Sequence, residues 1–575
     1  MSLKSTLITA LALAALAACG SDTTGPSLSV CGLVPPTTLA AGDVHLFDPA
    51  SGPCVAVPSV PAAGSGGAEY LYLAVSGAGT QTSTGVTGPY AITGAALPGT
   101  TADQTPIPSP LLGAFKPALT AEQFHMMLRR KERAIASDPR TALFRANVAR
   151  PPSLATTTPP SVGDLKSFQV CRNTNCDQPF VAVGARAQVV SGNLVIFVDT
   201  TVTPGSPQSY SPTDLTNIAQ LFDNYLYPID TTNYGRESDI DNNGVVEVLL
   251  TPQINRLSGS CNTTRSVILG YFFSVDLETS QPGSNKGEVF YSIVPDPNNT
   301  ACTISKQFAE DNLGPTFIHE FQHMISYNRH VLLAGGTSED TWLNEGMSHY
   351  AEELGGRLIP NNSIQNPLLQ PGETTLGQFA GGDYENAYSY LTNPEASALI
   401  ESDQSTGTLT ERGANWLMVK WLANQFGTTP PDSTHFIVPS TGFTLNLENT
   451  TLLGAANVAQ QSGQPFSDLV TYWQTANYLD DLPGFTPLNP RLQYVGFNLR
   501  AALAQLGKTP AFPLVPDSTK TGAYTHAGTL HQGSGRHVRI IQVAGASGVQ
   551  FKLSGAAGGA ISPTLAARVG LVRIR

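Results

Sequence analysis

The sequence predicts a protein of several domains, in which a central α+β domain is flanked by small β-sandwich-like domains at both ends. The chain has 575 residues, which is more than one hydrophobic core normally holds. Both ends carry short apolar segments between Gly- and Pro-rich turns, a pattern typical of strands. The middle carries longer segments whose apolar residues recur three and four positions apart, which predicts amphipathic helices.

The first residues predict a targeting segment. A short apolar run, too short to span a bilayer, ends in Leu16-Ala17-Ala18-Cys19-Gly20. This ending resembles the lipobox of bacterial lipoproteins, in which the cysteine becomes the lipidated N-terminus, although an ordinary signal peptide could also end at a cysteine. We expect a signal peptide over residues 1–18, lipid attachment at Cys19 and a lipid-anchored tether over residues 19–30. The protein would then be anchored to the membrane of the bacterial cell envelope, facing outside the cytoplasm, or be secreted.

Four further segments follow the tether. Residues 31–118 are expected to form an N-terminal β-domain and a Pro-rich linker. Residues 119–162 hold an amphipathic helix, whose basic residues are expected to face solvent, and a second linker. The central domain extends over residues 163–485. A C-terminal β-domain is expected over residues 510–575, where short strands alternate with Gly-rich turns.

Charge and cysteine content agree with an exported protein that does not bind nucleic acid. The net charge is −12 and no basic stripe occurs along the chain. Six cysteines remain after Cys19, and an even number in an exported chain predicts disulfides. Neighbours in the sequence suggest three pairs, although other pairings stay open: Cys31 with Cys54, Cys171 with Cys176, and Cys261 with Cys302.

The central domain contains the motif His-Glu-x-x-His. On a helix, His319 and His323 lie on one face, one turn apart, with Glu320 between them. Two neutral imidazoles at this spacing bind Zn²⁺, and the adjacent glutamate acts as general base on a zinc-bound water. Gly314-Pro315 predicts that the helix begins there, because proline suits the first helical turn.

A third protein ligand is expected downstream, with the fourth zinc position left open for water. Glu345 is the candidate. It lies in a segment of helical periodicity, with Ser338 as the expected N-cap and Gly355-Gly356 as the expected end. Two helices joined by a Gly-containing loop can bring Glu345 to His319 and His323.

The residues around this third ligand resemble a known clan of enzymes. Trp342-Leu343-Asn344-Glu345-Gly346 is similar to a segment of the aminopeptidase N family, whose glutamate is the third zinc ligand. His-Glu-x-x-His followed by Asn-Glu is the order of the gluzincins, which include thermolysin. Over about residues 160–480 the chain is most similar to the hyicolysin family of secreted bacterial neutral metallopeptidases, and the similarity is specific across about residues 315–355.

The resemblance implies a thermolysin-like (gluzincin) catalytic domain over residues 163–485. Its zinc ligands would be His319, His323 and Glu345, and Glu320 would be the base. His349, one helical turn after Glu345, would orient a zinc-bound imidazole, in the place where thermolysin has an aspartate.

The chain departs from the aminopeptidase N pattern in two ways. The Gly-x-Met-Glu-Asn motif, with which that family binds the free amine of its substrate, does not occur before His319. The position of the family's downstream tyrosine is occupied by Thr410. Aminopeptidase activity is therefore disfavoured, and the residue that stabilises the oxyanion is open among four candidates. They are Tyr384, Tyr388, Tyr390 and His330.

Residues 288–294 predict a strand shortly before the motif helix. In thermolysin-like architectures such a strand forms the upper edge of the active-site cleft and binds the substrate backbone by adding it to the sheet. We expect the same role here.

An acidic loop precedes another predicted strand. Asp239, Asp241 and Asn243 alternate before Gly244, which resembles the first half of an EF-hand-type Ca²⁺ loop. The glutamate expected at the twelfth position is absent, because that residue is Leu250. A tight Asn-Gly hairpin turn explains the same residues, so a structural Ca²⁺ ion stays open.

The function that we expect is an extracytoplasmic zinc endopeptidase, whose substrates are proteins or peptides. A zinc-activated water would hydrolyse the peptide bond, with Glu320 as general base. The alternatives are an aminopeptidase of the same clan and a non-catalytic surface binding lipoprotein.

Overall fold

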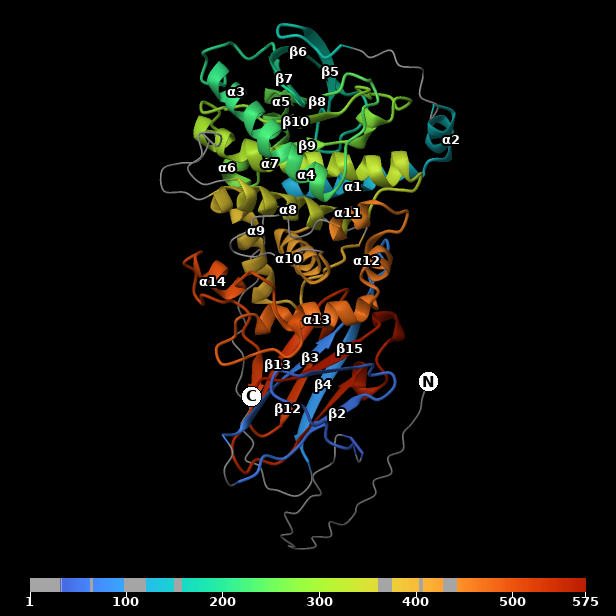
Figure 1. Ribbon diagram of the computed structural model, residues 1–575, viewed down its shortest axis with the longest axis vertical. Coiled ribbons are helices and arrows are strands. Elements are labelled where there is room, and N and C mark those ends of the chain that lie inside the picture. The colour runs from blue at the N-terminus through green and yellow to red at the C-terminus, as the bar shows by residue number, and fades with distance from the viewer. Residues whose placement is uncertain are drawn as a thin grey trace, which may run out of the picture.

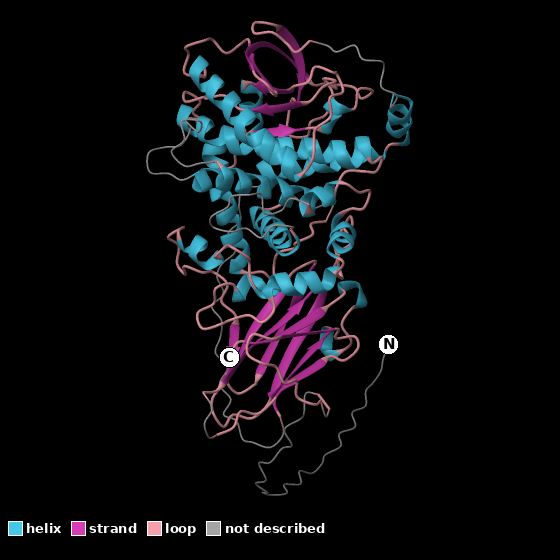
Figure 2. Cartoon of the chain, in the orientation of Figure 1, coloured by secondary structure: helices cyan, strands magenta, loops and turns pink. Residues whose placement is uncertain are grey.

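The computed structural model describes residues 31–32, 34–62, 66–97, 120–148, 158–359, 375–402, 407–427 and 442–575. The expected signal peptide, Cys19 and the tether lie outside these residues. Figure 1 shows an elongated molecule, with a mixed sheet and long helices at one end and a β-sandwich at the other. Helices fill the space between the two sheet regions (Figure 2).

Two sheets form the sandwich. The five-stranded sheet has the order β1-β15-β3-β13-β11 and the four-stranded sheet the order β12-β4-β14-β2. Their bounds are β1 Val44–Phe47, β2 Cys54–Val57, β3 Ala68–Val75, β4 Thr87–Ala96, β11 Asp517–Thr519, β12 Tyr524–His531, β13 Gly535–Gln542, β14 Val549–Ser554 and β15 Arg568–Arg573.

The sandwich corrects the expectation of separate β-domains at residues 31–118 and 510–575. Strand β3 lies between β15 and β13, and β4 lies between β12 and β14, so both ends of the chain share the same sheets. The rings of Tyr72 and Phe551, one from each end, lie 5.1 Å apart in the common core. Either segment alone would leave the backbone groups of its strands without partners, which explains why the two segments combine.

The second sheet belongs to the central region and has the order β5-β6-β7-β8-β10-β9. Neighbours β7, β8 and β10 run parallel, and the remaining pairs run antiparallel. The strands are β5 Leu165–Val170, β6 Val181–Val190, β7 Leu194–Asp199, β8 Val246–Leu250, β9 Gly270–Phe272 and β10 Val289–Ser292. Because β9 ends the order, its outer edge faces the helices that follow.

Helices cover this sheet and connect it to the sandwich (Figure 1). Helix α13 lies against the sandwich, where Gln474 donates a hydrogen bond of 2.7 Å to the Gly533 carbonyl. The bounds are α1 Thr120–Ser137, α2 Pro139–Val148, α3 Pro212–Leu221, α4 Tyr227–Asn233, α5 Pro252–Leu257, α6 Cys261–Thr264, α7 Lys306–Tyr327, α8 Thr341–Leu358, α9 Thr375–Thr392, α10 Leu409–Phe426, α11 Phe443–Glu448, α12 Gly454–Ser462, α13 Phe466–Leu479 and α14 Leu499–Ala504.

Helix α1 enters the central region instead of lying on its surface. Phe124 and Leu128 are buried, as its amphipathic pattern predicts. The expectation that its basic residues face solvent is wrong for Arg129, which is 3 % exposed. Arg129 pairs with Glu132 at 3.1 Å and donates to the Phe272 carbonyl at 3.0 Å, so the buried charge is compensated.

The three suggested disulfides are confirmed, and each joins sequence neighbours: Cys31–Cys54, Cys171–Cys176 and Cys261–Cys302. They constrain short loops, as is common in exported proteins. Across the described part of the chain, the helices lack the combination of length and apolar character that a membrane span requires.

Candidate metal centre

Helix α7 carries the motif and begins earlier than its sequence suggested. It starts at Lys306, where the Ser305 hydroxyl accepts a hydrogen bond of 3.0 Å from the Phe308 amide. Pro315 therefore lies inside the helix, not at its first turn. A proline there leaves the carbonyl four residues earlier without its helical donor. The side chain of Gln378 on α9 donates to that carbonyl, of Asp311, at 3.3 Å, which explains how the helix continues.

Helix α8 carries Glu345 and also differs at both ends. Asp340, not Ser338, occupies its N-cap position, and the helix continues through Gly355-Gly356 to Leu358. A Cβ at Gly355 would lie 2.7 Å from the Phe379 ring of α9. This glycine therefore allows α9 to pack closely against α8, and it does not end the helix.

Three ligand atoms converge between α7 and α8. The Nε2 atoms of His319 and His323 lie 3.1 Å apart. The Glu345 carboxylate lies 3.6 Å from His319 Nε2 and 3.7 Å from His323 Nε2. These separations are near the roughly 3.3 Å between donor atoms of a tetrahedral zinc site. The structure thus brings the three predicted ligands together.

The hydrogen-bond partners of the two imidazoles direct both Nε2 atoms to the centre of the cluster. His319 Nδ1 lies 2.7 Å from a Glu352 oxygen, and His323 Nδ1 lies 2.7 Å from Asn344 Oδ1. Both partners are acceptors, so each Nδ1 carries a proton and each Nε2 is left to face the cluster. Burial opposes ionisation of His319, but Glu345, Glu352 and Glu320 raise its pKa to about 10, so a proton lies between the two Nε2 atoms at 3.1 Å when no metal is bound, and a metal ion can replace it. Oε1 of Glu345 is buried without a hydrogen-bond partner. The donor set therefore fits Zn²⁺.

The prediction for His349 needs a correction. It does not bond to a zinc-ligand imidazole. Glu352, one turn later on α8, accepts from His319, and His349 Nδ1 lies 3.0 Å from the same Glu352 oxygen. His349 also contacts Asp383 at 2.9 Å. Burial opposes ionisation, but Asp383 and Glu352 raise the pKa of His349 to about 9, so His349 positions Glu352 through a charged contact.

Glu320 is placed beside the ligand cluster, as its sequence position predicts. It is 2 % exposed, and its Oε2 accepts a hydrogen bond of 2.7 Å from the Phe272 amide on β9. Burial raises the pKa of the Glu320 carboxyl above its ordinary value. A carboxylate held in this way is suited to take up and release a proton.

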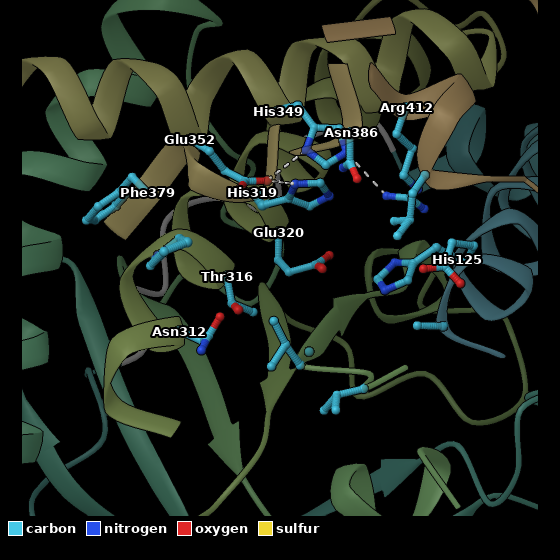
Figure 3. Close-up of a pocket in the computed structure, with 18 of the residues that line it drawn as sticks. His125, Asn312, Thr316, His319, Glu320, His349, Glu352, Phe379, Asn386 and Arg412 are labelled. Atoms are coloured by element: carbon cyan, nitrogen blue, oxygen red, sulfur yellow. Dashed lines mark hydrogen bonds and ion pairs between the residues drawn. The ribbon is translucent and has the colours of Figure 1, made fainter. Parts of the chain in front are cut away.

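A cavity of about 260 Å³ opens beside this cluster. Figure 3 shows the Glu320 carboxylate pointing to the space between His319 and His125. His125 comes from α1 and Arg412 from α10, and both line the cavity. Arg412 donates to Glu345 Oε2 at 2.9 Å, and its charge holds the pKa of Glu345 well below the ordinary value although burial opposes this.

Sequence reasoning missed His125 and gave no role to Arg412 or Glu352. The spacing of Glu345 and Glu352 on one helix face could have indicated Glu352, because both lie on the side that faces the motif helix. His125 and Arg412 are far from the motif in sequence, and no local pattern connects them to it.

None of the four oxyanion candidates belongs to the described residues that line this cavity. The Tyr388 hydroxyl donates to the Pro510 carbonyl at 2.8 Å, and Tyr390 bonds to Gln474 at 2.6 Å beside the sandwich. Tyr384 packs against Trp416, with ring centres 5.3 Å apart. His330 lies between Glu339 and Glu448 in a separate buried cluster.

The cleft-edge strand is β9 and not the predicted strand over 288–294. That segment is β10, which lies inside the sheet between β8 and β9. Leu269 and Gly270 line the cavity, and the Phe272 amide reaches Glu320 from the outer edge of β9. Phe272 already bonds to Glu320 and Arg129, so an extended chain in the cavity would pair with β9 at Gly270.

Comparison with known proteins gives one partial relationship. No protein-family model matches the chain. The chain is 32 % identical over 139 residues to the neutral metalloprotease ShpI of Staphylococcus hyicus. The matched segment is 24 % of this chain and 30 % of that relative, so it spans less than a third of the relative's length. Over this part of its length, the chain is related to a metalloprotease.

Proposed function

We propose that the protein is a zinc endopeptidase of the gluzincin type, which hydrolyses peptide bonds within proteins or peptides. The observation that carries this proposal is the convergence of His319, His323 and Glu345, with Glu320 beside them on the cavity wall. The partial similarity to a neutral metalloprotease supports the same reaction class.

The three ligands would hold the zinc ion, and Glu352 and Asn344 would keep their two imidazoles in the binding tautomer. When bound, zinc supplies Lewis-acid chemistry, which polarises the peptide carbonyl and lowers the pKa of water. Arg412 stays on Glu345 Oε2, which directs the free Oε1 of Glu345 to the metal.

Glu320 moves the proton. Its carboxylate takes a proton from the attacking water while the water oxygen bonds to the carbonyl carbon. The carboxyl then gives this proton to the amide nitrogen, and the C–N bond breaks to release an amine and a carboxylic acid, whose proton passes to the amine so that a carboxylate and an ammonium group result. The Phe272 amide keeps Oε2 fixed during both transfers.

We assign His125 as the hydrogen-bond donor to the negative oxygen that develops on the carbonyl. It lines the cavity beside His319, with ring centres 6.5 Å apart, and its Nδ1 is buried without a hydrogen-bond partner. Burial and the charge of Arg412 hold the pKa of His125 well below its ordinary value, so the ring is a neutral donor. His125→Ala should lower kcat about a hundredfold with little change in KM or zinc content. The exposed His45→Ala is the control, and an unchanged kcat in His125→Ala would remove this role.

One observation favours the aminopeptidase alternative. Glu122 lines the same cavity, is 8 % exposed and has a buried oxygen, Oε2, without a hydrogen-bond partner. Such a carboxylate can bind the free amine of a substrate. The Gly-x-Met-Glu-Asn motif for a free amine does not occur before His319, and Gly270 at the outer edge of β9 lines the cavity, where it can bind the backbone of an extended chain; both observations favour the endopeptidase.

Two substrate types separate these activities. Internally quenched peptides with blocked ends should be cleaved, and amino-acid amides should not. Cleavage of amino-acid amides but not of the blocked peptides, with loss of this cleavage in Glu122→Gln, would establish an aminopeptidase. His323→Ala should lose zinc by elemental analysis, and cleavage by the wild type should stop with a zinc chelator. If the wild-type protein contains no zinc and cleaves no peptide, the non-catalytic surface binding protein is the alternative that remains.

We also propose that Cys19 carries a lipid and anchors the enzyme outside the cytoplasm, on the basis of the sequence that precedes it. Metabolic labelling with a radioactive fatty acid should label the wild type and not Cys19→Ser. Equal labelling of both proteins would contradict the anchor.

A further inference from the structure

We propose that Asp239, Asp241 and Glu288 form a calcium site, separate from the catalytic cavity. One oxygen of each carboxylate lies within 4.8 Å of the others. The set contains oxygen atoms only, which a hard cation such as Ca²⁺ prefers, and it lacks the nitrogen and sulfur ligands typical of zinc sites.

The fold supplies the acid that the loop itself lacks. Leu250 occupies the position where an EF-hand loop has its last glutamate, and Leu250 is buried in β8. Strand β10 runs parallel to β8, and the Glu247 amide donates to the Glu288 carbonyl at 2.7 Å. Glu288 therefore stands next to the point where the acidic loop enters β8, and the residue that precedes the neighbouring strand β10 provides the third carboxylate.

The buried carboxylate of Glu288 is the feature that points to a bound ligand. It is 1 % exposed, and its Oε1 accepts from the Ser238 hydroxyl at 2.6 Å and the Ile240 amide at 3.0 Å. Its Oε2 is buried and has no hydrogen-bond partner. Burial and the charges of Asp241 and Asp239 raise the pKa of Glu288 to about 7. A buried carboxylate oxygen without a hydrogen-bond partner, on a carboxyl group close to two other acids, is unfavourable unless a cation compensates it.

The loop holds the other two carboxylates in place. The Gly244 amide donates to Asp239 Oδ1 at 3.1 Å, and the Asn243 amide donates to Asp241 Oδ1 at 3.1 Å. Asn243, the third oxygen donor that the sequence pattern left open, has its Oδ1 engaged, because it accepts from the Val245 amide at 2.8 Å. Asn243 stabilises the turn, and Glu288 takes its place as the third oxygen donor.

Lys166 is a cation close to this cluster. Burial raises the pKa of Asp241 and the charge of Lys166 opposes this, but the amino group of Lys166 is paired with Glu247 Oε2. Lys166 therefore compensates Glu247 and leaves the free oxygen of Glu288 uncompensated. The carboxylates come from a loop and a separate strand, and a site of this kind suits the flexible coordination of Ca²⁺ better than the strict octahedron of Mg²⁺.

The test is calorimetric titration of CaCl₂ into the full, zinc-loaded protein after dialysis in zinc-containing, calcium-free buffer. We expect one site with a Kd between about 10⁻⁶ and 10⁻³ M and, at a hundredfold excess over Kd, a melting temperature higher by roughly 5 °C. MgCl₂ should bind at least about tenfold more weakly.

Variants separate this site from a general effect of salt. In Glu288→Gln and Asp241→Asn, titration with CaCl₂ should give no binding heat and no rise in melting temperature. The calcium-free melting temperature of Glu288→Gln should equal or exceed that of the wild type, because a buried charge is removed. The exposed Asp177→Asn should respond like the wild type. The site would be overturned if the wild type showed no binding heat with CaCl₂, or if Glu288→Gln showed the same binding heat and the same rise in melting temperature as the wild type. Peptide hydrolysis measured on the same samples tests the zinc centre independently.

Discussion

Two buried clusters of histidine and glutamate lie on α7 and on the helical segment Asn328–Leu333 that continues it, and they differ in what their nitrogen atoms face. In the first, the Nε2 atoms of His319 and His323 face each other at 3.1 Å beside a cavity, with the Glu345 carboxylate 3.6 Å and 3.7 Å away. In the second, His330 Nε2 lies 3.2 Å from Glu448 and 3.6 Å from Glu339.

The difference shows that burial of charged groups alone does not make an active site. In the second cluster, burial opposes protonation, but Glu448 and Glu339 raise the pKa of His330 to about 9, so its own proton compensates the acids. In the first cluster burial likewise opposes protonation and the acids raise the pKa of His319 to about 10, but the Nε2 atoms converge with Glu345 beside a cavity, where a metal ion can take the place of the proton. Gln322 joins the two clusters, because it donates to Glu448 at 2.9 Å and accepts from Ser348, which contacts His323.

The largest effect is expected for Glu320→Gln. The amide keeps the shape of the side chain but cannot take the proton of water, so kcat/KM for a quenched peptide should fall by about a thousandfold or more. Zinc content and melting temperature should stay as in the wild type. Glu310→Gln, on the same helix and outside the cavity, is the control. Substantial activity in Glu320→Gln would assign the proton transfer to another group.

The next effect concerns zinc affinity. Glu352→Ala removes the acceptor that holds the His319 tautomer, so zinc should bind about 10- to 100-fold more weakly in a competition titration with a chelating dye. Glu385→Ala, on the exposed side of α9, should bind zinc like the wild type. Equal affinities of Glu352→Ala and the wild type would show that the tautomer does not depend on Glu352.

His330→Gln should destabilise the protein without removing zinc. The pKa of His330 is raised on folding from 6.5 to about 9, so its contribution is fully present below about pH 6.5 and is lost as the pH rises through about 9. The difference in unfolding free energy between wild type and variant should therefore shrink by up to about 3 kcal/mol across this range. Urea denaturation at about pH 6 and about pH 9.5 measures it, and a pH-independent difference would mean that His330 is neutral.

The smallest effect is expected for Gln322→Ala. Loss of its bond to Glu448 should lower the unfolding free energy by about 1 to 2 kcal/mol, and zinc affinity should change less than in Glu352→Ala because Gln322 does not touch an imidazole. Gln307→Ala, exposed on the same helix, is the control. A loss of zinc as large as in Glu352→Ala would show that the two clusters act as one unit.

The predictability of each part follows from how far apart its residues lie in the sequence. The relative positions of His319, Glu320 and His323 follow from the helical repeat, and one short connection separates Glu345 from them, so the sequence could predict these four residues. The predicted start of α7 at Gly314-Pro315 was wrong, because a side chain from α9 supplies the hydrogen bond that Pro315 cannot donate. No local pattern could indicate such a distant partner.

The same distance explains the errors in the sheets. The strands at both chain ends were expected, but not their pairing, because alternation of apolar residues is the same whichever neighbour a strand has. Glu288 and the edge strand β9 were missed for this reason too, since only the order of strands decides which one is outermost.

The pairing of the two chain ends has a consequence for release from a membrane. Strands β3 and β4 each have a C-terminal strand on both sides. A proteolytic cut between β4 and α1 would therefore leave the N-terminal fragment bound to the rest of the protein by the ladder hydrogen bonds of both sheets. With the lipid that we propose at Cys19, nicked protein would remain with the membrane until a denaturant separates the fragments. Release would require a cut ahead of Cys31, because the Cys31–Cys54 disulfide also joins the tether to β2.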